Sequence, residues 1–432
     1  MAGIGSRQEY ANGPVPESVA IVHGWRIALI KIGVIIALPA FVMGAEIGTA
    51  QGLGRSALVF AAGAAILTVL GMATGSMAAR TRLSTAQIIR LAFGRDGGRV
   101  VSFVLALTLL GWFGVTAQIF GESLAGIGRQ MGIGLGPTPY ILIGGSLMIT
   151  TTLFGFAGLQ RLSNLVMPLV GLVLLAMAFL GWRMAEPGVL LATPADPPTL
   201  GIGISAVVGA MVVGATIFPD ITRFARDAGQ ARIAALLSYG MMPLVLVLAA
   251  VPAIATGHRD LVALMVALGL GVPALLFLVV KAWMTNAGNL YSSSLGLSAA
   301  LGRVRHHWVV GAAGAIGVTL AALGVSSHLI PLMLAVGIAI PPVAAIYLTD
   351  YFTVSGRRYV PEMMAARPRL SVAAFLSWGL AVAVGAGASA GWYRLTGIPA
   401  IDAMLAAGLF HLLLSRLWFA RRAPIAIPEQ TS

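Results

Sequence analysis

The decisive stretch of this chain is VKAWMTNAGN, from Val280 to Asn289, which sets one lysine and two asparagines inside a long apolar run. Apolar runs of about 20 residues recur along the whole chain, and each is long enough to cross a hydrocarbon core of roughly 30 Å as a helix. A polar group inside such a run is costly in a bilayer, so this stretch indicates a functional site.

The composition indicates an all-α polytopic membrane protein. The 432 residues are 58% hydrophobic and 9% charged, with a mean hydropathy of +0.93, whereas soluble domains carry roughly 25% charged residues. Spanning β-strands would alternate polar and apolar residues, and these runs do not. The chain has no cysteine, which excludes disulfides and thiolate metal sites. The formal charge of +13 lies in short loops between the spans, so we expect no nucleic-acid partner.

The pattern of runs predicts twelve transmembrane helices, with tails at 1–25 and 419–432. If the N-terminus is cytoplasmic, the inside segments hold twenty arginines and the outside loops hold five, which supports that orientation and the even number of spans. The predicted spans are 26–50, 56–79, 99–124, 138–158, 162–182, 200–219, 232–256, 263–292, 307–324, 329–350, 370–391 and 398–418.

Two of these spans carry residues that interrupt helices. Pro39 and Gly44 fall in the first span, and Gly209 and Gly214 fall in the sixth. Interrupted spans at matching places in two halves are typical of inverted-repeat transporters, whose site lies at the bilayer midplane. We therefore expect one repeat over 26–182, a second over 200–350, and two further helices over 370–418. The alternative is that glycine and proline are simply common in membrane helices.

Four charged residues fall well inside spans: Lys31, Glu46, Glu122 and Lys281. We expect Lys31 to extend its stem to the cytoplasmic surface and Glu122 to lie in water near the outer end of its span. Glu46 is either an outer gate or a group that reaches the outer water. Lys281 is too central to reach either surface and needs another explanation.

Helical geometry divides the polar residues of the eighth span into two faces. At about 100° per residue, a cationic and hydroxyl face is separated from an amide face by about 100°. The first holds Lys281, Thr285, Gly288 and Ser292, and the second holds Asn286, Asn289 and Ser293. The alternative is that these groups only bind neighbouring helices.

Trp112 lies in the middle of the third span, flanked by Thr108 and Thr116 and beside Leu109. A mid-span tryptophan can stack a flat heterocycle, or it can be a packed core residue. We find no phosphate-binding loop, no zinc-binding histidine motif and no nucleophile–base pair, so we predict no catalytic residues, no cofactor and no enzyme activity. A polytopic membrane enzyme would need paired acidic or histidine residues facing across the spans.

Several motifs resemble the nucleobase:cation symporter-1 family, and most closely its bacterial cytosine permeases. They are spread in the family's order over about residues 12 to 360. The motifs are Gly13-Pro14-Val15-Pro16-Glu17-Ser18, Gly111-Trp112-Phe113-Gly114-Val115, Pro219-Asp220-Ile221-Thr222-Arg223-Phe224, Trp283-Met284-Thr285-Asn286 through Asn289-Leu290-Tyr291 and Leu295-Gly296, and Ala339-Ile340-Pro341-Pro342 through Asp350-Tyr351.

The resemblance implies a LeuT-like fold of two inverted five-helix repeats plus two helices, in a multi-pass protein of the bacterial inner membrane with both termini cytoplasmic. It implies transport of a small heterocycle that stacks on a tryptophan and is reached by residues of the first, third, sixth and eighth spans. The implied substrate residues are Trp112, Leu109, Ala37, Leu38, Ala210, Met211, Asn286 and Asn289. A sodium site would use carbonyls at Gly33, Ile36 and Lys281 and hydroxyls at positions 284 and 285.

The chain departs from the family at both sites. Leu109, Ala210 and Met211 stand where cytosine permeases have a glutamine, a serine and an aromatic residue, so the polar edge of cytosine would lose partners at about 1–3 kcal/mol each. We expect a less polar or differently decorated heterocycle; a hydantoin, allantoin or a thiamine-precursor pyrimidine remains open. At the ion site, Met284 stands where the family has a hydroxyl, and Thr285 follows Lys281 by one helical turn. The resemblance implies no protein partner.

These departures lead to a hypothesis about the coupling ion. If the Lys281 ammonium occupies or borders the sodium position, repulsion leaves no room for a second cation, and transport is coupled to protons. Burial favours the neutral amine, which suits a proton carrier. In the alternative, Lys281 points away and sodium binds to backbone carbonyls and Thr285.

Overall fold

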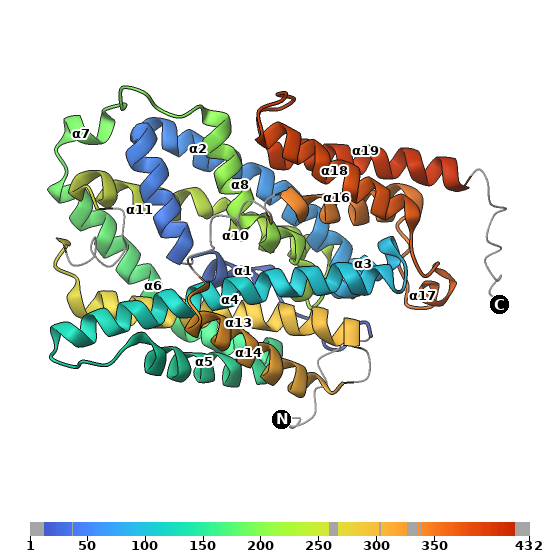
Figure 1. Ribbon diagram of the computed structural model, residues 1–432, viewed down its shortest axis with the longest axis horizontal. Helices are drawn as coiled ribbons and strands as arrows, with labels where there is room; N and C mark the ends of the chain where they lie inside the picture. The colour runs from blue at the N-terminus through green and yellow to red at the C-terminus, as the bar shows by residue number, and fades with distance from the viewer. Residues whose placement is uncertain are drawn as a thin grey trace.

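The computed structural model describes residues 13–36, 38–258, 267–301, 304–325, 336 and 338–419. Within these ranges the chain is helical and forms no strand, and most helices run along the long axis of the molecule (Figure 1). Seven of the described helices are long and apolar enough to cross a membrane. The all-α class is therefore confirmed, while parts of the predicted eighth and tenth spans lie outside the described residues.

The helices follow the predicted spans closely in most places. Their bounds are α1 Gly24–Ile35, α2 Leu38–Thr81, α3 Thr85–Phe93, α4 Gly97–Gln130, α5 Pro137–Leu153, α6 Gly155–Met184, α7 Pro187–Leu191, α8 Leu200–Thr216, α9 Pro219–Thr222, α10 Ala228–Gly240, α11 Met242–Thr256, α13 Gly271–Leu301, α14 His306–Ala322, α16 Pro341–Thr349, the π-helix η2 Asp350–Val354, α17 Met363–Ala366, α18 Val372–Ser389 and α19 Pro399–Phe419.

The first span is interrupted between α1 and α2. Ile36, with a ψ of 64°, leaves the helical region, and α2 begins at Leu38 with Pro39 in its first turn, where a missing N–H costs nothing. The predicted interruption is thus present. Gly44, however, lies inside α2, where a Cβ would stand 2.8 Å from the Leu246 carbonyl oxygen, so its role is close packing.

The sixth span is interrupted later than predicted. Helix α8 continues through Gly209 and Gly214 and ends at Thr216, and α9 begins at Pro219. A glycine costs a helix about 1 kcal/mol, which tertiary packing can offset, whereas proline removes an N–H and clashes with the preceding turn. The assignment of this interruption to the two glycines was wrong, and the proline marks its end.

A sharp kink at Gly52 separates the first and second predicted spans inside α2. Its φ of 74° and ψ of 163° are accessible to glycine but strained for other residues. A Cβ at this position would also collide with the Ala192 carbonyl oxygen. Helix α2 therefore contains both the second half of the first span and the whole of the second.

The helices pack in two groups around α1. Helix α4 runs along α13, and α5 and α14 pack on this pair in the lower part of Figure 1; α2 packs with α8, α10 and α11 on the other side. Helix α1 contacts α6, α10 and α13 and so bridges the groups. The pair α18 and α19 lies outside and is joined to the rest mainly through α16.

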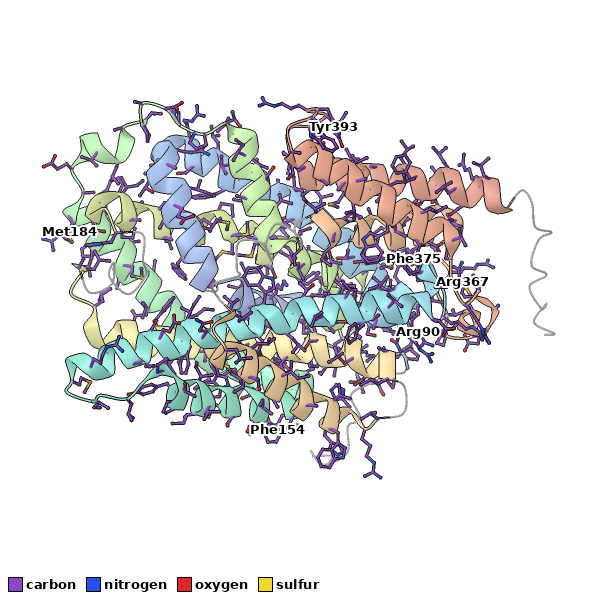
Figure 2. All side chains as sticks on the ribbon, in the orientation of Figure 1. Arg90, Phe154, Met184, Arg367, Phe375 and Tyr393 are labelled. Atoms are coloured by element: carbon purple, nitrogen blue, oxygen red, sulfur yellow. The ribbon has the colours of Figure 1, made fainter. Side chains whose placement is uncertain are left out.

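The two ends of the molecule separate labelled residues that the sequence assigns to different sides of the membrane. Figure 2 places Arg90 and Arg367, which the sequence assigns to the same side of the membrane, at one end. Met184, next to an arginine assigned to the other side, lies at the opposite end. At the first end, α3 starts with a capping box in which Ser84 and Gln87 bond each other's backbone N–H groups.

Candidate functional site

Lys281 reaches from α13 to the last turn of α1. Its side chain is fully buried, and Nζ donates to the Gly33 carbonyl oxygen at 2.5 Å. The carbonyls of a last helical turn lack intrahelical donors and carry partial negative charge, so an ammonium is stabilised there. Lys281 therefore points toward α1, at one of the carbonyls that the sodium-site resemblance names.

Two further residues of α13 surround this bond. The fully buried Met284 side chain fills the space beside Gly33, where a Cβ would collide with its Sδ and Cε atoms. Thr285 is buried, and its Oγ1 has no hydrogen-bond partner. The remaining predicted ligand, Ile36, forms the end of α1 and donates its N–H to the Ile32 carbonyl oxygen at 2.8 Å.

Lys31 does not reach the cytoplasmic surface, contrary to the prediction. It is 5% exposed, and Nζ donates to the Gly214 carbonyl oxygen in the last turn of α8 at 2.8 Å. The same nitrogen lies 5.9 Å from the ring centroid of Phe218 and 5.8 Å from that of Tyr239. Because α10 packs on this part of α1, the lysine stem is enclosed. Gly214 permits the approach, since a Cβ there would crowd the ammonium.

A cavity of about 100 Å³ lies between α1, α4, α8 and α13. Six residues predicted for the substrate or ion site line it, and Lys31 and Thr116 line it as well. The six are Leu109, Trp112, Ala210, Met211, Thr285 and Asn289. Lys281, Gly33 and Ile36 lie outside the lining, as does Asn286. Ala37 lies outside the described residues, and the structure does not describe the Leu38 side chain.

Asn286 faces away from this cavity. Its Nδ2 donates to the Phe113 carbonyl oxygen at 3.0 Å and to Met148 Sδ at 3.4 Å, and the residue is fully buried. Thr285 and Asn289 are four residues apart and share a helix face, while Asn286 is turned by about 100° from Thr285 toward α4 and α5. The cavity therefore receives Thr285, Gly288 and Ser292 of the first predicted face and Asn289 of the second, which corrects the predicted placement of Asn286.

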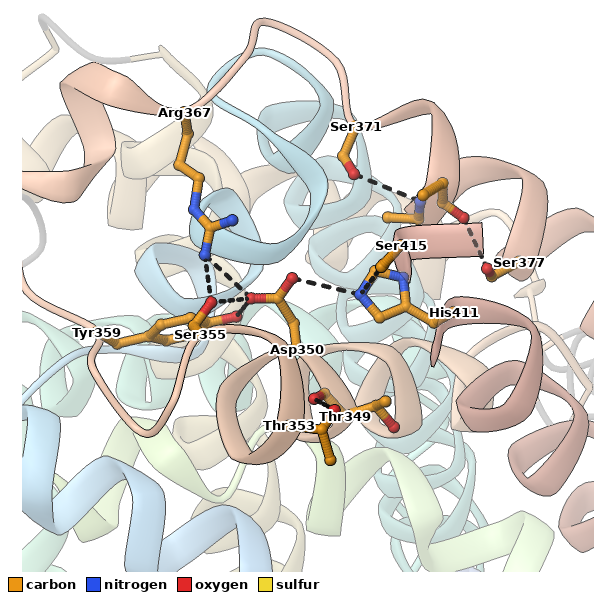
Figure 3. Close-up of polar contacts among 12 residues, drawn as sticks. Thr349, Asp350, Thr353, Ser355, Tyr359, Arg367, Ser371, Ser377, His411 and Ser415 are labelled. Carbon is orange, nitrogen blue, oxygen red and sulfur yellow. Dashed lines mark hydrogen bonds and ion pairs between the residues drawn. The ribbon is translucent and has the colours of Figure 1, made fainter. Parts of the chain in front are cut away.

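A polar cluster that the sequence did not predict joins η2 to α19 (Figure 3). The Asp350 carboxylate accepts from Ser355 at 2.7 Å, Tyr359 at 2.8 Å and Arg367 at 3.0 Å, and lies 3.3 Å from His411 Nε2. Burial raises the pKa of the Tyr359 phenol well above its usual value, which keeps it a donor. The only sequence signal was the place of Asp350 in a family motif, and the cluster serves to hold helices together.

A helical membrane protein with two interrupted spans facing one central cavity belongs to the class of secondary transporters with a LeuT-like fold. Comparison with known proteins gives the family. A family model described as permease for cytosine/purines, uracil, thiamine and allantoin matches residues 14–408. The chain belongs to this family, so it is a permease rather than an enzyme.

Individual relatives agree with this assignment. The chain is 29% identical to the cytosine permease of Escherichia coli K12, with 94% of each chain covered, and 24% identical to the hydantoin permease of Microbacterium maritypicum, with 96% of this chain and 90% of the relative covered. Among solved structures, Mhp1 in a closed conformation with bromovinylhydantoin bound has a TM-score of 0.83 at 20% identity, covering 97% of this chain and 96% of Mhp1. This likeness confirms the predicted fold class.

Proposed function

We propose that this protein imports a nucleobase or a related small heterocycle by alternating access and couples the import to protons rather than to sodium. The observation that carries the coupling is the bond from Lys281 Nζ to the Gly33 carbonyl oxygen. This bond supports the proposal because the resemblance expects the Gly33 carbonyl to be a sodium ligand. The proposed location is a bacterial inner membrane with both termini in the cytoplasm.

The chemistry around Lys281 supports this proposal. A sodium ion is a hard cation that prefers oxygen ligands, and Met284 offers a soft thioether in place of a hydroxyl. Its side chain also fills the space next to Gly33. A second positive charge close to the ammonium would be repelled strongly in this buried setting. The site is therefore poor for sodium in both ligand type and charge.

The cavity supports a flat, partly apolar substrate. Trp112 lines it from α4, with Leu109 one turn before and Thr116 one turn after, and Ala210 and Met211 line it from α8. An indole ring can stack on a heterocycle, and only a few polar groups are then needed to orient the ligand. Asn289, which is 9% exposed, supplies one amide for that purpose.

One observation favours the alternative of a sodium-coupled transporter for a hydantoin, allantoin or thiamine-precursor pyrimidine. Thr285 Oγ1 is buried without a hydrogen-bond partner and remains an available oxygen ligand. A sodium ion bound there would have to share the region with the Lys281 ammonium, which is the cost of this alternative.

Uptake by proteoliposomes, with radiolabelled nucleobases and hydantoins, tests both proposals. We expect accumulation in sodium-free buffer that increases when the outside is made more acidic than the inside. Strong stimulation by sodium with no response to the pH gradient would establish the alternative. The substrate itself is sought by thermal unfolding of the purified protein against a panel of pyrimidines, purines and hydantoins, because a ligand bound only by the folded state raises its stability.

A further inference from the structure

The cavity carries a positive charge without an acidic partner in its wall. Among the described residues that line it, Lys31 is the only charged side chain, and no aspartate or glutamate is present. The polar groups beside it are hydroxyls, one amide and the indole of Trp112. A ligand in this cavity therefore meets a single full charge, and that charge is a cation.

The neighbouring charges add to this imbalance. Lys281 of α13 lies behind the cavity wall, where it bonds the Gly33 carbonyl oxygen on α1, the helix that carries Lys31. Asp220 lies in α9, directly after the interruption that follows α8, and is outside the cavity lining. Its carboxylate accepts from the backbone N–H of Thr85 at 2.9 Å. Asp220 is also close to the buried Arg223, which offsets its charge. Asp220 acts on Lys31 from behind the wall, but it shares its charge with Arg223, so the cavity lining itself keeps an excess positive charge.

The position of Lys31 suits a ligand that brings its own negative charge. The Gly214 carbonyl oxygen takes one of the three ammonium donors and holds the nitrogen at the cavity wall. Phe218 and Tyr239 present ring faces to the ammonium, and these attract a cation more weakly than an anion does. In a site of low dielectric, a charge-assisted hydrogen bond to an anion is much stronger than one to a neutral carbonyl.

We propose that the cavity selects a heterocycle that is anionic at neutral pH, with a carboxylate or an ionised ring imide bound to Lys31 Nζ while the ring stacks on Trp112. This inference rests on the proposed function, because it names the substrate class of the same site. Ala210 and Met211, which offer no side-chain donor, leave Lys31 as the dominant polar contact on that side of the cavity.

Binding of matched pairs of probes to the purified full-length protein tests this inference. Uracil is compared with uracil-6-carboxylate, and hypoxanthine with urate; in each pair the second compound is anionic at pH 7.5. We expect the anionic member to bind wild-type protein at least tenfold more tightly. Lys31→Met should remove this preference by weakening anion binding at least tenfold, and Lys31→Arg should retain it. Arg55→Met, which removes a charge from a side chain bonded to the Pro198 carbonyl oxygen, is the control.

The outcomes separate this inference from the proposed function. Equal or tighter wild-type binding of the neutral members overturns the inference, and if that binding is lost in Trp112→Ala the proposed function stands. Anion preference that persists in Lys31→Met also overturns it. Binding of no member of either pair counts against both. The wild-type comparison is decisive by itself even if Lys31→Met does not fold.

Discussion

Replacement of Lys281 by methionine removes the charge while nearly preserving the shape of the side chain. The substitution loses the hydrogen bond to the Gly33 carbonyl, and a bond to a charged group contributes about 1.5–3 kcal/mol. It also relieves the cost of an ion inside a membrane helix, about 2.5–3.5 kcal/mol. Because the two terms oppose each other, we expect the free energy of unfolding to change by no more than about 2 kcal/mol.

The effect on transport should be larger than the effect on substrate affinity. Lys281 does not line the cavity, so substrate affinity should stay within about threefold of wild type, or about 0.7 kcal/mol. Uptake driven by a pH gradient should fall at least about tenfold, which corresponds to only about 1.4 kcal/mol. This free energy is smaller than the contribution of the hydrogen bond that the substitution removes.

The assay compares wild type, Lys281→Met and the control variant Arg55→Met in the same sodium-free proteoliposomes, with and without an imposed pH gradient. Substrate binding and thermal unfolding are measured on the same preparations. Accumulation by Lys281→Met at the wild-type level under the gradient would refute the coupling role of this lysine.

Three further outcomes follow from the structure. The double substitution Lys281→Ala with Met284→Ser restores a hydroxyl and removes the tethered cation, so uptake should become sodium-dependent; a sodium titration of uptake measures this, and Lys281→Ala alone is its control. Trp112→Ala should weaken substrate binding at least about tenfold, or about 1.4 kcal/mol, whereas Trp112→Phe should retain most of it; calorimetry would contradict the stacking role if both bind alike. Asp350→Asn weakens charge-assisted bonds to Arg367 and His411, so the protein should lose about 1–3 kcal/mol of stability, seen as a lower thermal midpoint, with substrate affinity unchanged.

The fold was largely predictable because a run of about 20 apolar residues reliably indicates a membrane-spanning helix. The interruption near Pro39 was found because proline has a backbone effect that does not depend on its neighbours. Gly209 and Gly214 misled the prediction because a glycine either ends a helix or lets another group approach, and only packing decides between them. At Gly214 the group that approaches is the Lys31 ammonium.

The site was predictable in its residue types and less so in their directions. Periodicity divided Thr285 and Asn289 between two faces and could not say which side of α13 faces the cavity. Both residues line the cavity, whereas Asn286, which was assigned to the substrate, bonds the backbone of α4. Lys31 was expected to reach water because its distance along the span allowed it. The packing of α10 over α1, a contact between segments about 200 residues apart, closes that route.

The Asp350 cluster has a practical consequence for measuring motion. Through His411, the carboxylate attaches α19 to η2, which directly follows α16. Leu409 on α19 is 55% exposed, and the chain contains no cysteine, so Leu409→Cys would give a unique position for a spectroscopic label. Because α19 is fastened to α16, distances from this label to a second one on α14 would report displacement of the tenth span during the transport cycle without touching any residue of the cavity.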